Sequence, residues 1–281
     1  MIKNIAYFPL QCAKNSTAVY NAALDVLQCS GIQIKENSMH CDAALIWSVL
    51  WQGRMKLNRD VYYHYRQQNK PVIILEIGAL YRGHTWKVAV NHITRDGYYG
   101  HQDTVDMHRP NRLGISLATQ IQSKPHVLIA LQHAHSEQVA TLGNMTQWLS
   151  AMIRKVKAHT DRPIVVRPHP RSAINLSALP ANIVIQKPRP VVNSYDSFDM
   201  HFDCHAVINH NSGPGIQAAI AGVRPIVDTS SLAWPVAVDL CNIEKSYDID
   251  RQLWLAQLCH TEYTLDEIKQ GIWLKRIAPA L

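Results

Sequence analysis

The sequence predicts an α/β protein built from two Rossmann-like halves, and two observations carry that prediction. Short apolar runs typical of strands alternate with amphipathic stretches typical of helices along the whole chain. The chain has 281 residues, of which 47% are hydrophobic and 17% charged. Because domains commonly span about 100 to 200 residues, this length is enough for two compact halves. We therefore expect parallel sheets covered by helices.

Each expected element follows from its local pattern. The expected strands are short apolar runs followed by polar or turn residues: 2–8, 43–47, 72–75, 127–131, 163–166, 183–185, 206–208 and 224–227. Helices are expected where a capping residue precedes apolar residues at three- and four-residue spacing. They follow Ser16 to about 29, Ser136 to about 159, Asp250 to about 259 and Thr264 to about 273.

A polar stretch at 95–125, punctuated by glycine and proline, interrupts this alternation. We therefore place a domain boundary near residue 122, which predicts an N-terminal domain of residues 1–122 and a C-terminal domain of residues 123–281.

Composition narrows the class of function. A net charge of +7 with fifteen histidines favours a polyanionic partner such as nucleic acid, although no tail of Lys and Arg is present. No window approaches the roughly 20 apolar residues of a membrane span, and the first residues lack the apolar core of a signal peptide. The six cysteines are scattered without a Cys-x-x-Cys pair, so we expect reduced thiols in a cytoplasmic protein, host cytoplasm if the gene belongs to a phage.

One expected strand runs straight into two prolines and three basic side chains. Pro168 and Pro170 disfavour helical geometry in the residue before each, so the chain stays extended. Arg167, His169 and Arg171 then project from the carboxyl end of the strand, where open α/β sheets bind ligands. Arginine offers phosphate a planar charged fork, and a neighbouring imidazole donates a hydrogen bond or a proton. A rigid turn with solvated charges is the alternative.

Residues 207–220 have the pattern of a strand, a glycine-bearing turn and the start of a helix. Asn211 or Ser212 can cap that helix, while Gly213 and Gly215 let a ligand approach the backbone. The N–H groups of the first turn then form an anion site, for which phosphate is the natural occupant. The segment is neither the G-x-G-x-x-G pattern nor the P-loop, which disfavours NAD chemistry and ATP hydrolysis. A purely structural turn is the alternative.

Three segments in this order resemble the donor domain of GT-B glycosyltransferases, particularly those related to capsule-polysaccharide synthesis enzymes. They are residues 167–170, 211–215 and 222–227. The resemblance covers about 125–230 and implies that these segments hold the phosphates of a nucleotide. Gln217 stands where that family has a glutamate, so the resemblance does not extend to a ribose-binding carboxylate there.

Other segments, at 86–91, 231–237 and 250–255, resemble tailed-phage proteins described as DNA-modifying glycosyltransferases. Together the resemblances imply two Rossmann-like domains facing a cleft in the GT-B manner. They also imply a nucleotide-sugar, expected to be UDP-linked, in the C-terminal domain. His169 is then expected to be catalytic, and the expected donor-binding residues are Gln132, Arg167, Arg171, Asn211, Ser212, Gly213 and Gly215.

The N-terminal domain then holds the acceptor. Glu76 ends an apolar strand, where a carboxylate can take the proton of an acceptor hydroxyl, so it is the expected catalytic base. The residues expected to bind the acceptor are Arg82, Trp86 and Lys87. A structural carboxylate paired with Arg82 or Lys87 is the alternative role of Glu76. Asp42 and Asp96 are reserve candidates for the base.

No metal site is expected. His133 and His135 form a His-x-His pair, but no third ligand has a fixed spacing to it. Asp248 and Asp250 match the Asp-x-Asp pattern of metal-dependent transferases but lie at a helix start, where capping explains them better. We therefore expect no cofactor beyond the nucleotide-sugar.

The sequence thus predicts a metal-independent glycosyltransferase that moves a hexosyl or pentosyl group from a UDP-sugar to a hydroxymethylated pyrimidine, such as 5-hydroxymethylcytosine, in phage DNA. One alternative is a glycosyltransferase of surface polysaccharide synthesis. The other is a DNA-binding protein that keeps the fold without turnover.

Overall fold

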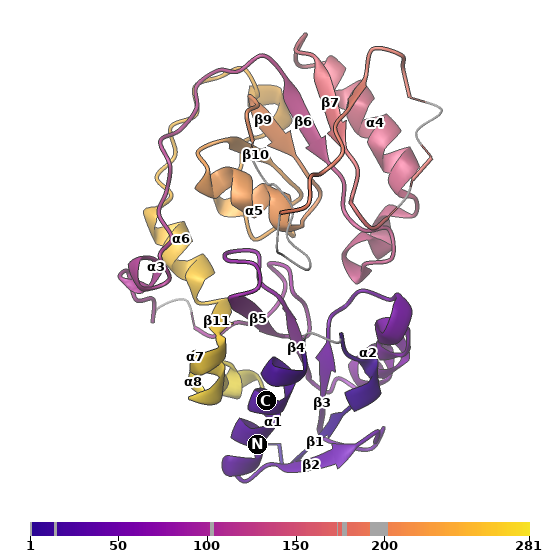
Figure 1. Ribbon diagram of the computed structural model, residues 1–281, viewed down its shortest axis with the longest axis vertical. Coiled ribbons are helices and arrows are strands. Elements are labelled where there is room, and N and C mark those ends of the chain that lie inside the picture. Colours follow the sequence, from indigo (N-terminus) through magenta and orange to yellow (C-terminus); the bar gives the residue numbers. More distant parts are fainter. Residues whose placement is uncertain (1, 14–15, 102–103, 173, 176–178, 192–201) are drawn as a thin grey trace. The chain divides into compact units, whose positions relative to one another are not determined.

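The computed structural model describes residues 2–13, 16–101, 104–172, 174–175, 179–191 and 202–281. The chain divides into two compact units (Figure 1). Unit 1 consists of Met1–Arg109 together with Ala256–Leu281, and unit 2 consists of Pro110–Leu255. Each unit is described by itself.

Unit 1 contains a six-stranded sheet in the order β11-β5-β4-β3-β1-β2. The strands are β1 (Asn4–Tyr7), β2 (Gln33–Glu36), β3 (Ala43–Trp47), β4 (Val72–Ile77), β5 (Thr85–Val90) and β11 (Glu262–Thr264). The first four are parallel to one another, while β5 and β11 are antiparallel to their neighbours. Strand order therefore reverses between β1 and β3.

The helices of unit 1 complete its layers. They are α1 (Thr17–Cys29), α2 (Asn58–Gln67), α7 (Leu265–Lys269) and α8 (Ile272–Ile277), with short 3-10 turns at Pro9–Gln11 and Gly53–Leu57. The main apolar core joins α1, α7 and α8 to one face of the sheet, where Leu27, Leu75 and Trp273 are fully buried. Successive side chains of a strand point to opposite faces of the sheet, so alternate residues of each strand contribute to this core.

Unit 2 contains a five-stranded, fully parallel sheet in the order β10-β9-β6-β7-β8. The strands are β6 (Val127–Ala130), β7 (Ile164–Arg167), β8 (Val184–Ile185), β9 (Ala206–Ile208) and β10 (Arg224–Ile226). The chain moves outward from β6 in one direction through β7 and β8, then in the other direction through β9 and β10. The order reverses between β6 and β9, which is the place where a doubly wound sheet opens a crevice for ligand.

Helices cover both faces of the unit 2 sheet. The helices that pack on it are α4 (Met145–Lys157) and α5 (Gly213–Ile220), and 3-10 turns lie at Glu137–Leu142, Trp234–Val236 and Leu240–Asn242. The chain passes from one unit to the other within α3 (Arg109–Arg112) and within α6 (Gln252–Cys259). The apolar stripe of α4 packs on one face through Leu149, Ile153 and Val156. Ala218 of α5 belongs to a second core cluster on the other face. Two separate cores are what a doubly wound unit requires.

The expected boundary at residue 122 differs from the observed division. Unit 2 begins thirteen residues earlier along the chain than the sequence predicts, and the C-terminal segment belongs to unit 1. That segment returns because β11 extends the first sheet beside β5. Arg109 also holds it, since the buried guanidinium donates to the carbonyls of Cys259 at 2.6 Å and Glu262 at 2.7 Å and pairs with Glu267 at 2.5 Å.

Helix ends follow the expected capping only in part. Ser16 precedes α1, but its hydroxyl donates to the carbonyl of Ala13 instead of capping the helix. The helix expected after residue 136 is a 3-10 turn followed by α4, because Gly143 adopts a positive φ of 69° between them. Gly271, with φ of 70°, likewise separates α7 from α8. Thr264 does begin α7 with a complete capping box.

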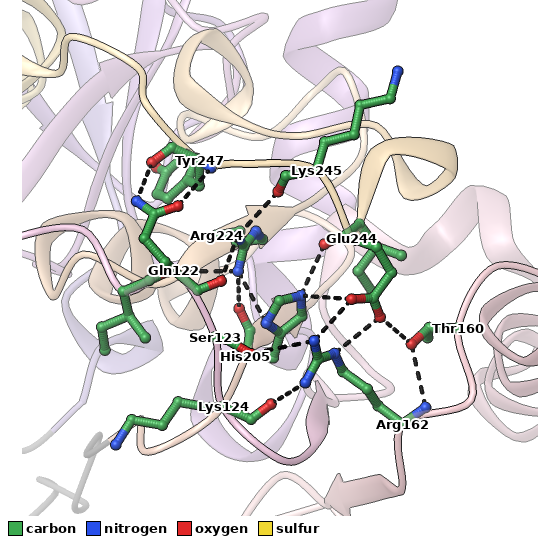
Figure 2. Close-up of polar contacts among 12 residues, drawn as sticks. Gln122, Ser123, Lys124, Thr160, Arg162, His205, Arg224, Glu244, Lys245 and Tyr247 are labelled. Atoms are coloured by element: carbon green, nitrogen blue, oxygen red, sulfur yellow. Dashed lines mark hydrogen bonds and ion pairs between the residues drawn. The ribbon is translucent and has the colours of Figure 1, made fainter.

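A buried arginine ties together the amino ends of the unit 2 strands (Figure 2). Arg224 begins β10 and donates to Nδ1 of His205 at 3.0 Å and to the carbonyls of Gln122 at 2.8 Å and Lys245 at 3.1 Å. Because Nδ1 of His205 accepts, the proton lies on Nε2, which donates to the carbonyl of Ile243 at 2.8 Å. Burial lowers the pKa of His205, which favours this neutral form.

A second arginine extends that network (Figure 2). Arg162 Nε and Nη2 donate to the two carboxylate oxygens of Glu244 at 2.9 and 2.8 Å, and the Thr160 hydroxyl donates to the same carboxylate. Arg162 also donates to the carbonyl of Lys124, just before β6. The hydrogen bonds from Arg162 lower the pKa of Glu244 to about 2.

Across the described part of the chain, no helix combines the length and apolar character that crossing a membrane demands.

Candidate functional site

Polar side chains from separate loops meet at the carboxyl ends of the unit 2 strands. Gln132 follows β6 and Asn211 follows β9, the two strands that flank the reversal of strand order. The Gln132 amide donates to Asn211 Oδ1 at 3.0 Å, and the backbone N–H of Asn211 donates to Gln132 Oε1 at 3.2 Å. Both residues are buried. This reciprocal pair therefore lies where open α/β sheets bind ligands.

A second set of contacts joins the loop after β6 to the loop after β7. The rings of His133 and His169 meet edge to face, with their centroids 5.0 Å apart. His133 also forms a hydrogen bond with the backbone of Arg171, and the N–H of Ala134 donates to Ser172 Oγ at 3.1 Å. The loops after β7, β6 and β9 therefore form one continuous cluster, which we call the three-loop cluster.

Arg167 and His169 occupy different positions in this cluster. Arg167 is the last residue of β7 and is buried; its guanidinium donates to Gln186 Oε1 at 2.6 and 3.1 Å and lies 5.4 Å from the centre of the Phe202 ring. These contacts give it a structural role besides any role toward a ligand. The N–H of Arg171 donates to His169 Nδ1 at 3.2 Å. In the neutral ring the proton is therefore on Nε2, which can donate to an anion.

Asn209 organises the turn that follows β9. Its Nδ2 donates to the carbonyl of Ala130 at 2.8 Å, while its Oδ1 accepts the N–H of Ser212 at 2.8 Å. The Ser212 side chain makes no capping bond to α5, and the Asn211 amide donates to Ser230 Oγ at 2.9 Å. Ser212, one of the two expected residues, therefore occupies the cap position of α5, but its side chain makes no capping hydrogen bond. The side chain of Asn209 instead makes hydrogen bonds at this turn, through both Nδ2 and Oδ1.

The first turn of α5 offers fewer backbone donors than the sequence predicts. Gly213 is its first residue, Pro214 has no N–H, and the N–H of Gly215 donates to the carbonyl of Ser212 at 3.2 Å. A Cβ added at Gly215 would lie 2.7 Å from Val227 Cγ1, so glycine is required there by packing between α5 and the segment after β10. The structure thus explains Gly215 by packing, whereas the sequence predicts that a ligand approaches its backbone.

The loop after β10 adds a carboxylate to the same end of the sheet. The Ser230 hydroxyl and N–H donate to Asp228 Oδ1 at 2.6 and 2.9 Å. Burial opposes the charge on Asp228, but the hydrogen bonds from Ser230 outweigh it, so the pKa of Asp228 is lowered. Because Ser230 also accepts from Asn211, the fourth loop is joined to the three-loop cluster. Burial lowers the pKa of His210, and the nearby charge of Asp228 partly offsets it.

Positive groups dominate the electrostatics of the loops after β6 and β7. Burial lowers the pKa of His133, and the charges of His135 and Arg171 lower it further. The rings of His133 and His135 lie 5.7 Å apart. An anion bound among these groups gains charge-assisted hydrogen bonds and relieves their mutual repulsion. The cluster can therefore hold a phosphate.

Glu76 and Lys87, two of the residues expected at the acceptor, lie opposite each other in unit 1. Glu76 is on β4 and Lys87 on β5, and Lys87 also lies opposite Glu262 of β11. Ser48 Oγ donates to Glu76 Oε2 at 2.6 Å, and the N–H of Ile77 donates to Oε1 at 2.9 Å. Lys87 is buried, which lowers its pKa, while the charges of Glu262 and Glu76 act in the opposite direction.

Trp86 and Arg82 lie apart from that pair. Successive residues of a strand point to opposite faces, so Trp86 is on the other face from Lys87, where it packs against the apolar core of unit 1. Arg82 is in the loop between β4 and β5 and forms a β-bridge with Thr85. The structure thus brings Glu76 and Lys87 together and gives Trp86 a packing role.

Two other acidic residues, Asp42 and Asp250, have structural roles. Asp42 Oδ2 accepts the backbone N–H groups of Lys3 at 2.7 Å and Asn4 at 3.1 Å, at the amino end of the sheet and away from the ends that bind ligands. Asp96 accepts a long hydrogen bond of 3.4 Å from a neighbouring threonine in its own turn. Asp250 Oδ1 accepts the N–H of the first residue of α6 at 2.9 Å, which confirms capping as its role.

Within the ranges that the structure describes, no group of three or more His, Cys, Asp and Glu side chains is arranged to hold a metal ion.

Sequence reasoning missed several residues of these sites, among them Ser48, Asn209 and Ser230. Asn209 and Ser48 share a signal, because each is the first polar residue after an expected apolar strand. That position places a side chain at the carboxyl edge of a parallel sheet. Ser230 lies in the turn after the expected strand 224–227 and carries no comparable signal.

Two solved structures resemble the chain over almost its whole length. The beta Kdo 2,4 transferase of Thermosulfurimonas dismutans KpsC has a TM-score of 0.53 and 11% sequence identity, with 96% of this chain and 98% of that chain covered. The beta Kdo 2,7 transferase of the same KpsC has a TM-score of 0.51 and 14% identity, with 97% and 99% covered. No protein-family model and no curated protein matches the chain.

These comparisons establish the fold and not the reaction, because identity this low carries no information about substrate. The predicted fold class, α/β with two Rossmann-like domains of the GT-B type, is confirmed by the sheet order of each unit and by the likeness to both transferases. The cleft between the domains stays a prediction.

Proposed function

We propose that the chain is a glycosyltransferase whose nucleotide-sugar binds at the carboxyl ends of β6, β7 and β9. One observation carries the proposal: the Gln132–Asn211 pair and the His133–His169 contact join three loops at the reversal of strand order. The likeness to two Kdo transferases supports sugar transfer in general.

The chemistry of sugar transfer fits the charges of the cluster. When the sugar leaves, negative charge develops on the phosphate oxygens, and a site lowers the barrier by holding donors where that charge appears. His169 Nε2, Arg167 and Arg171 are the proposed donors. Because fixed positive groups supply this stabilisation, we propose a reaction without a metal ion and without a cofactor beyond the nucleotide-sugar. In unit 1, Glu76 is the proposed base for the acceptor hydroxyl.

The finer proposal is a UDP-sugar as donor and a hydroxymethylated pyrimidine in phage DNA as acceptor. The net charge of +7 supports a polyanionic acceptor. The resemblance of three segments to phage DNA-modifying proteins supports DNA in particular. A base within a duplex must leave the stack before its hydroxyl can react, so single-stranded or flipped substrate is expected. A glycan is the second candidate acceptor, because the donor-domain segments resemble capsule-polysaccharide synthesis enzymes.

Donor binding provides the first test. Thermal unfolding is followed with UDP and a panel of nucleoside diphosphate and monophosphate sugars, with NAD and ATP as controls. A ligand that binds only the folded chain raises the midpoint in proportion to the logarithm of its concentration. Arg167→Ala and His169→Ala should remove this effect. Arg154→Ala is the matched control, because it removes an exposed cation from the last turn of α4, which leads to the amino end of β7.

Product analysis provides the second test. The chain is incubated with DNA containing 5-hydroxymethylcytosine and the panel of nucleotide-sugars, and the nucleosides are then analysed by mass. A mass increase of one sugar residue supports the DNA acceptor, and product made only on a glycan supports the second candidate. The proposed function is contradicted when no nucleotide raises the midpoint of thermal unfolding, or when the rise persists in both Arg167→Ala and His169→Ala.

A further inference from the structure

A row of polar side chains crosses the unit 1 sheet at one level. The register places Glu76 of β4 opposite Lys87 of β5, and Lys87 opposite Glu262 of β11. Ser48 directly follows β3, the other neighbour of β4, and its hydroxyl reaches Glu76. All five residues of β3 and the first four of β4 are buried and apolar. Burying a polar group costs free energy unless the group is hydrogen-bonded, so this row needs a structural or functional explanation.

The two carboxylates in the row have different surroundings. Glu262 is fully buried and accepts from the N–H groups of Ala79 at 2.7 Å and Leu80 at 3.0 Å and from the Thr85 hydroxyl at 2.8 Å. It therefore fixes the loop between β4 and β5. Glu76 is only partly buried and lies at the carboxyl end of its strand. Glu76 is thus the carboxylate of the row that a substrate can reach.

The direction of the Ser48 hydroxyl is fixed by its partners. The N–H of Leu50 donates to Ser48 Oγ at 3.1 Å, so the oxygen already accepts one hydrogen bond. Its own proton is then directed to Glu76 Oε2 at 2.6 Å. The N–H of Ile77 donates to the other oxygen, Oε1, at 2.9 Å. Each carboxylate oxygen receives one donor, which fixes the plane of the group.

The backbone at Ser48 is unusual for a serine. Its φ of 64° lies in the left-handed region, which a side chain with a Cβ disfavours. The N–H of Ser48 donates to the carbonyl of Leu75 at 2.7 Å, which holds the turn against β4. Glycine would adopt this conformation more easily. The serine therefore contributes a hydroxyl at a position where the backbone alone favours glycine, and such outliers gather at functional sites.

We propose that Ser48 is a positioning residue that orients the Glu76 carboxylate for proton removal from the acceptor hydroxyl. This inference rests on the proposed function. In the transfer step the acceptor oxygen bonds to the anomeric carbon while its proton passes to Glu76. The bond from that carbon to the phosphate oxygen breaks, and its electron pair leaves with the phosphate. Ser48 touches neither substrate and acts only through Glu76.

The test compares Ser48→Ala and Ser48→Gly with Glu76→Gln. Ser30→Ala is the matched control, because it removes an exposed hydroxyl that only bonds the carbonyl of Val26 at the end of α1. Transfer from UDP-glucose to DNA containing 5-hydroxymethylcytosine gives kcat and KM separately. The NMR chemical shift of the Glu76 carboxyl carbon at one fixed pH gives a readout that needs no turnover. Stability is followed by thermal unfolding, and donor binding by the shift that UDP produces.

Both substitutions of Ser48 should lower kcat about tenfold, the effect of one charge-assisted hydrogen bond, leave KM unchanged, and move the chemical shift of the Glu76 carboxyl carbon. Ser48→Gly should unfold at the same or a higher temperature, and the UDP shift should be unchanged. An equal chemical shift of the Glu76 carboxyl carbon in Ser48→Ala and the unsubstituted chain overturns the inference, and so does loss of activity in the alanine variant alone, because strain then explains that loss. Full activity of Glu76→Gln instead contradicts the assignment of Glu76 as the general base in the proposed function.

Discussion

Replacing Gly215 by alanine separates two explanations of the glycine in the turn after β9. The added Cβ would lie 2.7 Å from Val227 Cγ1, about 1 Å closer than two carbon atoms pack without strain. A β-branched valine cannot rotate away freely, so overpacking should cost about 1–3 kcal/mol. The higher helix propensity of alanine offsets up to about 1 kcal/mol of that cost. We therefore expect a net loss of about 1–2 kcal/mol.

Calorimetry checks this value through the midpoint of thermal unfolding, which should fall by about 2–8 °C for a unit of this size. The double variant Gly215→Ala with Val227→Ala removes the clash and supplies the control. The double variant should lose less stability than the two single variants added together, by about 1 kcal/mol or more, since the residues are in contact. An unchanged midpoint combined with lost UDP binding refutes the packing argument and restores the ligand-approach role that the sequence predicts.

Two further predictions concern the stability of unit 2. Burial lowers the pKa of four histidines below the ordinary value of 6.5, so the folded state binds fewer protons than the unfolded state; they are His126, His133, His205 and His210. The guanidinium chloride midpoint should therefore be highest above about pH 6.5 and fall as the pH drops to 5. A higher midpoint at pH 5 contradicts this. Arg224→Met leaves the carbonyls of Gln122 and Lys245 without their donor and should cost about 2–4 kcal/mol in the same assay at pH 7.5, with the UDP shift retained.

The sequence predicts the strands of unit 2 and the loops that follow them because both depend on local patterns. An apolar run that ends in Arg167 and is followed by two prolines can only leave the sheet extended, whatever the rest of the chain does. The helix after Gly213 likewise begins where expected. Since the carboxyl ends of parallel strands share one edge, correct strands are enough to bring Gln132, His169 and Asn211 to that edge.

The features that sequence analysis missed depend on partners distant in the chain. β11 is three residues long, and nothing local marks it as a neighbour of β5, about 175 residues earlier. The return of the C-terminal segment to unit 1, and with it the true end of unit 2, follows from that pairing and from the buried Arg109. Ser48 escaped notice for the same reason, since its role depends on Glu76 of the adjacent strand.

The two ends of the unit 2 sheet use different chemistry, and this difference separates stability from binding. At the amino ends, the guanidinium groups of Arg224 and Arg162 donate to carbonyls and to Glu244 (Figure 2). At the carboxyl ends, the pairs that join the loops, Gln132 with Asn211 and His133 with His169, lie among loops that also carry Arg171. Removing a buried, charge-assisted donor costs more than removing a neutral pair. Substitutions of Arg224 and Arg162 should therefore act mainly on unfolding, and those of the pairs that join the loops mainly on ligand affinity.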